Sequence, residues 1–202
     1  MRATLSTLLL AALLVGCMPA PPPEDPHRFV LLDAQGQPRA NGNDHHCVFD
    51  SATQLTWAVP RAGDALHDAA HRYTWFSEDR AQHLGEPGVA GGGDCALERC
   101  DTHGLLAAVN AAGLCGHHDW RLPTHEEAIM LGKRHGEAAL GMHPRLFPDA
   151  KGGEVWTATT FRLYPQSAWA YNPGNALDRA DLKTQAKGVR LVRGTLVLPR
   201  RR

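Results

Sequence analysis

We predict that this chain of 202 residues forms one α+β domain outside the cytoplasm, braced by disulfide bonds. Three observations support this: an N-terminal apolar segment typical of an export signal, an even number of cysteines after it, and two helical patterns between short strand-like segments. The 21 basic and 21 acidic residues balance, so the overall charge does not favour nucleic acid as a partner.

The N-terminus has the pattern of a bacterial lipoprotein signal peptide, residues 1–16. Arg2 supplies a positive charge, and the apolar run at 5–15 is too short to span a bilayer comfortably. A glycine directly precedes Cys17, which resembles the lipobox, so we expect Cys17 to be lipidated as the first mature residue. The residue after Cys17 is Met18 and not aspartate. By resemblance to Gram-negative sorting rules, this favours the outer membrane. We therefore expect a lipid anchor in the outer membrane, with the domain on its periplasmic or surface face.

The rest of the chain divides into a tether, one domain and a short tail. Residues 17–27 are rich in proline and predict an extended, lipid-anchored linker. Residues 28–198 are long enough for one domain with a real core, without repeats or a second apolar span. The basic tail at 199–202 is expected to be solvated rather than to bind a specific anionic partner.

Four cysteines remain in the mature chain, and three pairings are possible. Cys95 and Cys100 can close a small ring within the glycine-rich loop at 77–100, which leaves Cys47 to pair with Cys115. Loop entropy gives about 4 kcal/mol for the long closure and about 2 kcal/mol for the short one. A zinc site built from cysteine and histidine is the alternative, which an oxidising compartment disfavours.

Short strands are predicted towards both ends of the domain. Their patterns cover 28–33, 47–59 (two strands around the turn at 50–53), 71–76, 154–160, 167–172 and 188–194. Trp57 alternates with Leu55 and Val59 on one apolar face, and Trp156 lies within a strand pattern. Both tryptophans are expected in the core.

Two helices are predicted between these strands. The first covers 101–113; Asp101 or Thr102 can cap its start, and Gly113 can end it in the left-handed conformation. The second opens at Thr124, where the sequence THEE forms a capping box.

The chain carries, in this order, the segments CVFDSATQLTWAV, DTHGLLAAVNAAGLCGHHDWRLPTHEEAIML, VWTATT, AWAYN and VRLVRG. Over residues 45–195 they resemble the Lcl C-terminal domain family, named after the C-terminal domain of a collagen-like adhesin. The resemblance implies a C-type-lectin-like fold, also related to formylglycine-generating enzymes, with two helices packed on a small irregular antiparallel sheet. Most members have no assigned activity. The eponymous domain binds sulfated polysaccharides through a basic surface, whereas this chain is charge-balanced.

The sequence DWRLP places a cation between two apolar residues. If Trp120 and Leu122 pack inward, Arg121 is partly buried and needs a carboxylate or carbonyl partner, such as Asp119. We interpret this segment as structural, with Trp120 in the core and Arg121 tying loops together.

Two histidine pairs flank the cysteines of the long bridge, which would hold their alpha carbons about 5–6 Å apart. Imidazoles suit zinc, copper or nickel. An alternative function is therefore metal binding by His45, His46, His117 and His118. Adjacent histidines on an extended chain point to opposite faces, so at most one of each pair is expected to converge. The competing interpretation is a set of exposed polar histidines.

Aromatic and amide side chains gather in the C-terminal third and suggest a ligand-binding surface, formed by Tyr164, Trp169, Tyr171 and Asn172. Alternation places Trp169 and Tyr171 on one face, and Tyr164 and Tyr171 are the better candidates for exposure. Such aromatic rings can stack on sugars or contact a protein.

No catalytic motif of the G-x-S-x-G, phosphate-loop or H-E-x-x-H type occurs in the sequence, so we expect neither enzyme activity nor a cofactor. We predict an envelope lipoprotein that recognises a glycan or a protein. The metal-binding alternative and a periplasmic inhibitor or immunity-type protein are the other candidate functions.

Overall fold

The computed structural model describes residues 27–40, 44–132, 134–135 and 138–198. The expected signal peptide at 1–16, the linker at 17–27 apart from its last residue, and the tail at 199–202 lie outside these residues. No helix within the described ranges is long and apolar enough to cross a membrane.

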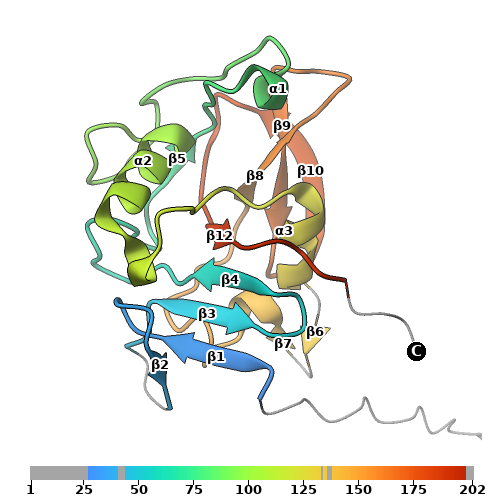
Figure 1. Ribbon diagram of the computed structural model, residues 1–202. Coiled ribbons are helices and arrows are strands. Elements are labelled where there is room, and N and C mark those ends of the chain that lie inside the picture. Colours follow the sequence, from blue (N-terminus) through green and yellow to red (C-terminus); the bar gives the residue numbers. More distant parts are fainter. Residues whose placement is uncertain (1–26, 41–43, 133, 136–137, 199–202) are drawn as a thin grey trace, which may run out of the picture.

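The described residues form an α+β fold with several small antiparallel sheets (Figure 1). The largest sheet has the strand order β12-β4-β3-β1-β2 and comprises β1 (Phe29–Leu32), β2 (Pro38–Arg39), β3 (Cys47–Asp50), β4 (Leu55–Ala58) and β12 (Val192–Arg193). A second sheet has the order β10-β9-β8 and comprises β8 (Val155–Thr160), β9 (Ser167–Asn172) and β10 (Leu177–Leu182). Two-stranded sheets pair β5 (Tyr73–Thr74) with β11 (Ala186–Lys187), and β6 (Arg134–His135) with β7 (Ala138–Ala139).

The helices of the described chain are α1 (Arg80–His83), α2 (Thr102–Ala112) and α3 (His125–Gly132), with short 3₁₀ turns η1 (Leu114–Gly116) and η2 (Leu140–Met142). The two predicted helices are confirmed. The Asp101 side chain caps α2 by accepting from the Gly104 N–H, and Gly113 ends α2 at φ 68°. The capping box also forms: the Glu127 N–H donates to the Thr124 hydroxyl at 3.2 Å, and the Thr124 N–H donates to the Glu127 carboxylate at 2.9 Å.

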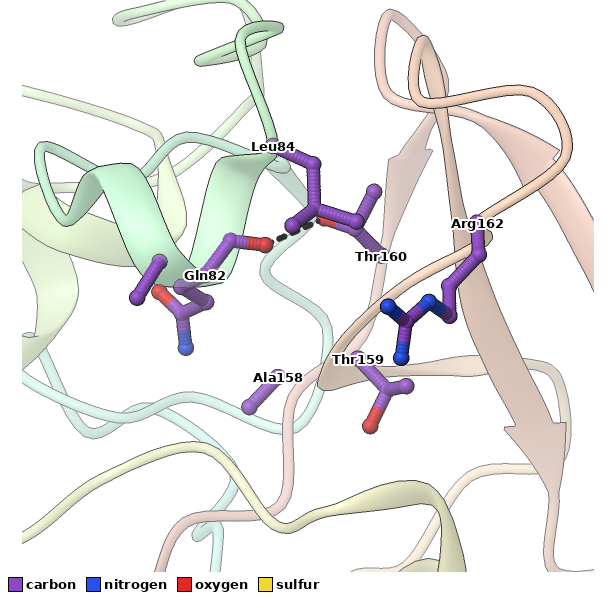
Figure 2. Close-up of a pocket in the computed structure, with 7 residues that line it drawn as sticks. Gln82, Leu84, Ala158, Thr159, Thr160 and Arg162 are labelled. Carbon is purple, nitrogen blue, oxygen red and sulfur yellow. Dashed lines mark hydrogen bonds between the residues drawn. The ribbon is translucent and has the colours of Figure 1, made fainter.

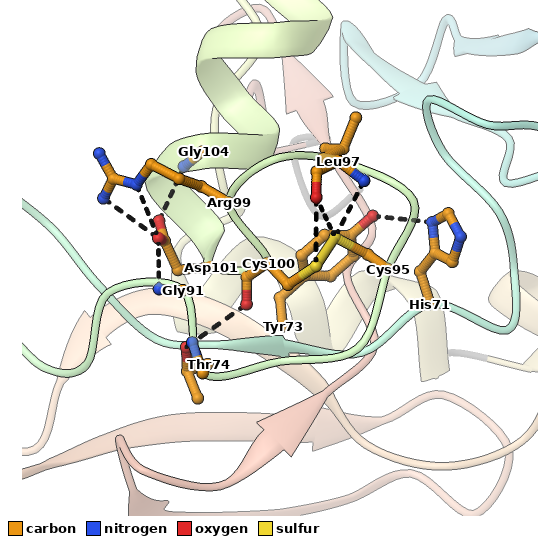
Figure 3. Close-up of a disulfide and its surroundings, with 11 residues drawn as sticks. His71, Tyr73, Thr74, Gly91, Cys95, Leu97, Arg99, Cys100, Asp101 and Gly104 are labelled. Atoms are coloured by element: carbon orange, nitrogen blue, oxygen red, sulfur yellow. Dashed lines mark hydrogen bonds and ion pairs between the residues drawn. A yellow bond between two sulfur atoms is a disulfide. The ribbon is translucent and has the colours of Figure 1, made fainter.

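Both predicted disulfides are present. Cys47–Cys115 joins β3 to η1 across 68 positions of sequence. Cys95–Cys100 closes a short ring in the loop before α2 (Figure 3). Beside this ring, the Asp101 carboxylate accepts from the Gly91 N–H at 2.8 Å in addition to capping α2. The local bridge and this carboxylate together order the glycine-rich loop.

Two clusters of buried side chains form the core. The first lies under α2 and contains Trp75, Trp120 and Trp156, and the second lies under α3 and contains Trp57. Two tryptophan indoles in the first cluster join the segment at 73–75 to β8. Trp75 donates to the Thr157 carbonyl at 2.9 Å, and Trp156 donates to the Tyr73 carbonyl at 2.8 Å. These bonds satisfy buried N–H groups while the rings fill the core.

Some elements differ from the sequence predictions. Strand β10 is not predicted by its sequence LDRADL, because its side chains are mostly exposed or charged and lack apolar alternation. Helix α1 is one short turn inside the predicted loop at 77–100. The strands expected at 71–76 and 188–194 are shorter, with β5 and β12 covering two residues each.

Candidate functional site

An aromatic face lies where the second sheet meets α3; we define it as His125, Phe161, Tyr164, Trp169 and Asp178. The Trp169 ring, on β9, stacks against the His125 imidazole with centroids 4.5 Å apart and an interplanar angle of 11°. The Phe161 ring meets Trp169 edge-on at 5.3 Å, and Tyr164 lies 5.9 Å from Phe161. The four rings therefore form one continuous contact chain.

Three elements hold His125 in place. It is the first residue of α3, and its backbone N–H donates to the Thr159 hydroxyl of β8 at 3.1 Å. Its Nε2 lies 2.5 Å from a carboxylate oxygen of Asp178 on β10. Contacts from α3, β8 and β10 therefore hold the His125 imidazole over the Trp169 ring.

The loop at 161–166 carries the exposed part of this face. Tyr164 is 60% exposed and Leu163 is 77% exposed. Backbone bonds shape the loop as a tight turn: the Tyr164 N–H donates to the Phe161 carbonyl at 3.1 Å, and the Ser167 N–H donates to the Tyr164 carbonyl at 2.8 Å. A large aromatic side chain is thus presented to solvent on a hydrogen-bonded turn.

A groove of about 320 Å³ lies between α1 and β8 and shares this loop. Figure 2 shows Gln82 entering from the α1 side, with Thr159 and Arg162 on the other side. The Thr160 hydroxyl donates to the Gln82 carbonyl at 2.7 Å and joins the two walls. Arg162 is exposed and has no ion pair or hydrogen bond with any other described residue. The groove therefore offers amide, hydroxyl and guanidinium groups beside the aromatic face.

A model of the Lcl C-terminal domain matches residues 46–193, which include the aromatic face, the groove and both disulfides. The chain belongs to the Lcl C-terminal domain family. No curated protein and no solved structure matches it.

Of the residues expected at the binding surface of this Lcl C-terminal domain, Tyr171 is buried and Asn172 takes part in a turn. Tyr171 shares its side of β9 with Trp169, but it is only 2% exposed, and α3 covers it. Its hydroxyl lies 3.5 Å from the Ile129 carbonyl, and burial raises its pKa. The expectation that Tyr171 is exposed is therefore wrong. Asn172 is half-buried and accepts from the Gly174 N–H at 2.9 Å, which shapes the turn after β9.

The sequence does not reveal several residues of the site, namely His125, Phe161, Gln82 and Arg162, whereas Asp178 is expected near the aromatic residues from its position in the C-terminal third. Phe161 and Arg162 share the loop after β8, but His125 and Gln82 lie in other elements, and the packing of α1 and α3 beside the second sheet brings them together. The stacked His125 is the clearest example, because its sequence position indicates a helix start and nothing about Trp169.

The DWRLP segment of the Lcl C-terminal domain has a structural role. Arg121 donates to both carboxylate oxygens of Glu127 at 2.7 Å and to the Gly194 carbonyl at 2.8 Å. Burial raises the pKa of Glu127, but the bonds from Arg121 and Thr124 outweigh it, so the pKa lies below its usual value. Asp119, the partner expected for Arg121, instead accepts from Arg193 at 2.8 Å, and that bond lowers the pKa of Asp119.

The histidine cluster of the metal-binding alternative does not form among the described residues. His45 is fully buried, with its Nε2 2.8 Å from the Leu146 carbonyl, while the Nδ1 of exposed His118 lies 2.5 Å from the Asn110 carbonyl. Across the described residues, no three His, Cys, Asp or Glu side chains are placed to hold a metal ion, so His46 and His117 join no such group. The disulfide does bring the two segments together, but His45 and His118 each contact a backbone carbonyl of a different segment.

Proposed function

We propose that this Lcl C-terminal domain binds a glycan through the aromatic face and the adjoining groove. The observation that carries the proposal is the exposed Tyr164 ring, supported by Phe161, on the same loop as Arg162 of the groove. Sugars place their C–H faces against aromatic rings, and their hydroxyls bond to polar side chains nearby. Gln82, Thr159 and Arg162 are such side chains.

The rigidity of the face supports a recognition role. The contacts of His125 with Trp169 and Asp178 hold the His125 and Trp169 rings in place, which reduces the ordering cost of binding at this part of the face. We propose a non-catalytic function, because in the described chain no serine or cysteine side chain hydrogen-bonds to the His125–Asp178 pair. A mixed lining of polar groups beside one exposed ring suits a sugar better than the apolar centre of a protein interface.

The test is a glycan array probed with the purified full-length chain, followed by titration of any sugar that binds. Tyr164→Ala should weaken binding about two- to tenfold, because one aromatic contact contributes roughly 0.5–1.5 kcal/mol. Arg162→Ala should also weaken it. Leu177→Ala is the matched control and should leave binding unchanged: Leu177 is 66% exposed and lies at the end of β9–β10 away from Tyr164, and by strand alternation its side chain faces away from that of Asp178, which contacts His125.

Two outcomes would contradict the glycan proposal. One is silence across the array combined with capture of an envelope protein that depends on Tyr164. The other is sugar binding that Tyr164→Ala and Leu177→Ala affect equally. The first result would favour a protein ligand on the same face.

We also propose that the domain is anchored in the outer membrane through lipid on Cys17, on the basis of the signal-peptide pattern and the proline-rich tether. A C-type-lectin-like fold is proposed as well, supported by α2 and α3 packed beside small antiparallel sheets. Labelled palmitate should be incorporated by the full chain and not by Cys17→Ser, and the variant should leave the outer-membrane fraction. Labelling of Cys17→Ser would contradict the anchor.

A further inference from the structure

Arg190 is a cation inside the core. It is 3% exposed, and its chain neighbours Val189 and Leu191 belong to the first core cluster. One terminal nitrogen, Nη1, donates weakly to the Val189 carbonyl at 3.4 Å, while Nε and Nη2 have no hydrogen-bond partner among the described residues. A buried guanidinium without a counter-charge is costly, so a negative charge or further hydrogen-bond acceptors beside it would stabilise the folded state.

His67 lies close enough to this guanidinium for the charge of Arg190 to act on its ring. It is also 3% exposed, and neither ring nitrogen has a partner within the described chain. Burial and then the charge of Arg190 lower the pKa of His67 to about 4, while the Val189 carbonyl and the Asp64 carboxylate act more weakly in the opposite direction. Near neutral pH the ring is therefore uncharged and keeps one N–H donor.

Further positive charge lies close by. Burial and the charge of Arg72 lower the pKa of Arg190 to about 10. The Arg72 guanidinium points to backbone carbonyls, including those of Ala70 at 2.9 Å and His71 at 2.8 Å. It brings no carboxylate to Arg190.

The acidic residues of the same loop face other groups. Asp64 accepts from the Leu66 N–H at 2.8 Å, and Asp68 accepts from the Gly63 and Ala70 N–H groups at 2.5 and 2.6 Å. These backbone bonds close the turns of the loop at 61–72. Within the described residues, no salt bridge links either carboxylate to Arg190.

We propose that Arg190 and His67 form an internal site for a small anion of the size of chloride. Nε and Nη2 lie on one edge of the guanidinium plane, which offers two parallel N–H groups to a single acceptor. The N–H of uncharged His67 would supply a third donor in place of its interaction with the Val189 carbonyl. Because both side chains are almost fully buried, the ligand has to be small, and its negative charge would neutralise Arg190 without a carboxylate.

The test is thermal unfolding of the purified full-length chain at constant ionic strength, with chloride replacing gluconate. Between about 1 mM and 300 mM chloride the melting temperature should rise by roughly 5 °C, because a ligand that binds the folded state raises it. Arg190→Met should abolish this dependence on chloride. Arg145→Met removes an exposed cation and should keep it.

A second measurement covers the case in which Arg190→Met does not fold. Crystals of the unmodified protein grown in bromide should show an anomalous peak within contact distance of Arg190 Nε and Nη2. His67→Gln should weaken the response to chloride without abolishing it. An equal response in the parent chain and Arg190→Met, or bromide crystals with no peak at Arg190, would overturn the proposal.

Discussion

Arg121 and Arg190 both carry a guanidinium into the domain, but the two groups meet different partners. Arg121 forms a two-point pair with Glu127 at 2.7 Å, so the buried Glu127 carboxylate is compensated. Arg190 has no carboxylate partner in the described chain, and beside it His67 stays uncharged at neutral pH. Removing charge at these two positions should therefore have different consequences.

Arg121→Met should destabilise the domain by about 2 kcal/mol, because it leaves the buried Glu127 carboxylate without its main partner. This value is lower than that for a fully buried pair, since the Arg121 side chain is 38% exposed. Urea unfolding measures the effect. The double variant Arg121→Met/Glu127→Met should recover part of the loss, and Arg193→Met, which breaks the more exposed pair with Asp119, should cost about 1 kcal/mol or less. Equal losses for Arg121→Met and Arg193→Met would contradict the role assigned to Arg121.

His67 should make the domain sensitive to acid. Its pKa in the folded state is about 4, against 6.5 as its ordinary value, so below pH 6.5 the unfolded chain binds a proton that the folded chain does not. Stability should then fall by up to about 3 kcal/mol as the pH drops from 6.5 to 4. His67→Gln should flatten this part of the curve of unfolding free energy against pH, measured at low chloride. An unchanged slope in the variant would show that other groups cause the acid sensitivity.

Helix α1 depends for its position on residues that are distant in the sequence. Lys183, 2% exposed and directly after β10, covers the Trp75 ring at 3.9 Å and donates to the Glu86 carbonyl at 2.6 Å and more weakly to the His83 carbonyl at 3.4 Å. The Thr160 hydroxyl holds Gln82 from the other side. A single helical turn is too short to be stable alone, so these contacts keep one wall of the groove in place.

Lys183→Met should loosen α1 while leaving the core packed, because methionine keeps much of the apolar stem and loses the donors. Hydrogen exchange of backbone amides at 80–92 should become about tenfold faster, corresponding to roughly 1.4 kcal/mol of local stability. Peptides covering α3 serve as the internal control. Equal acceleration in both regions would mean that Lys183 supports the whole domain rather than α1.

Some helices and strands can be predicted from the sequence and others cannot. Helices α2 and α3 were predictable, because capping residues and apolar spacing are local signals. Strand β10 and helix α1 were not, since their side chains are largely exposed and their stability comes from neighbours. The same holds for the site: Tyr164 was predictable as an exposed aromatic residue, whereas the burial of Tyr171 depends on α3, which no strand pattern indicates.

The Cys47–Cys115 bridge joins two segments that lie 68 positions apart in the sequence. It ties β3 of the largest sheet to η1, directly after α2, and both cysteines belong to the first core cluster. Strand β12 returns to the same sheet beside β4 (Figure 1). The bridge therefore restrains a long segment of chain, whereas Cys95–Cys100 restrains one loop.

Replacing each bridge with a pair of alanines should separate these roles. Cys47→Ala/Cys115→Ala should lower the free energy of unfolding by about 4 kcal/mol, and Cys95→Ala/Cys100→Ala by about 2 kcal/mol, because the unfolded chain regains more freedom when the longer loop opens. Guanidinium unfolding of the full-length chain measures both values. The short-loop variant should also exchange amides faster at 91–100, with α3 unaffected. If the two variants lose equal stability, chain entropy is not the main contribution of the long bridge. The losses would then come from packing of the buried Cys47–Cys115 sulfurs in the first core cluster and from local ordering of the loop by Cys95–Cys100.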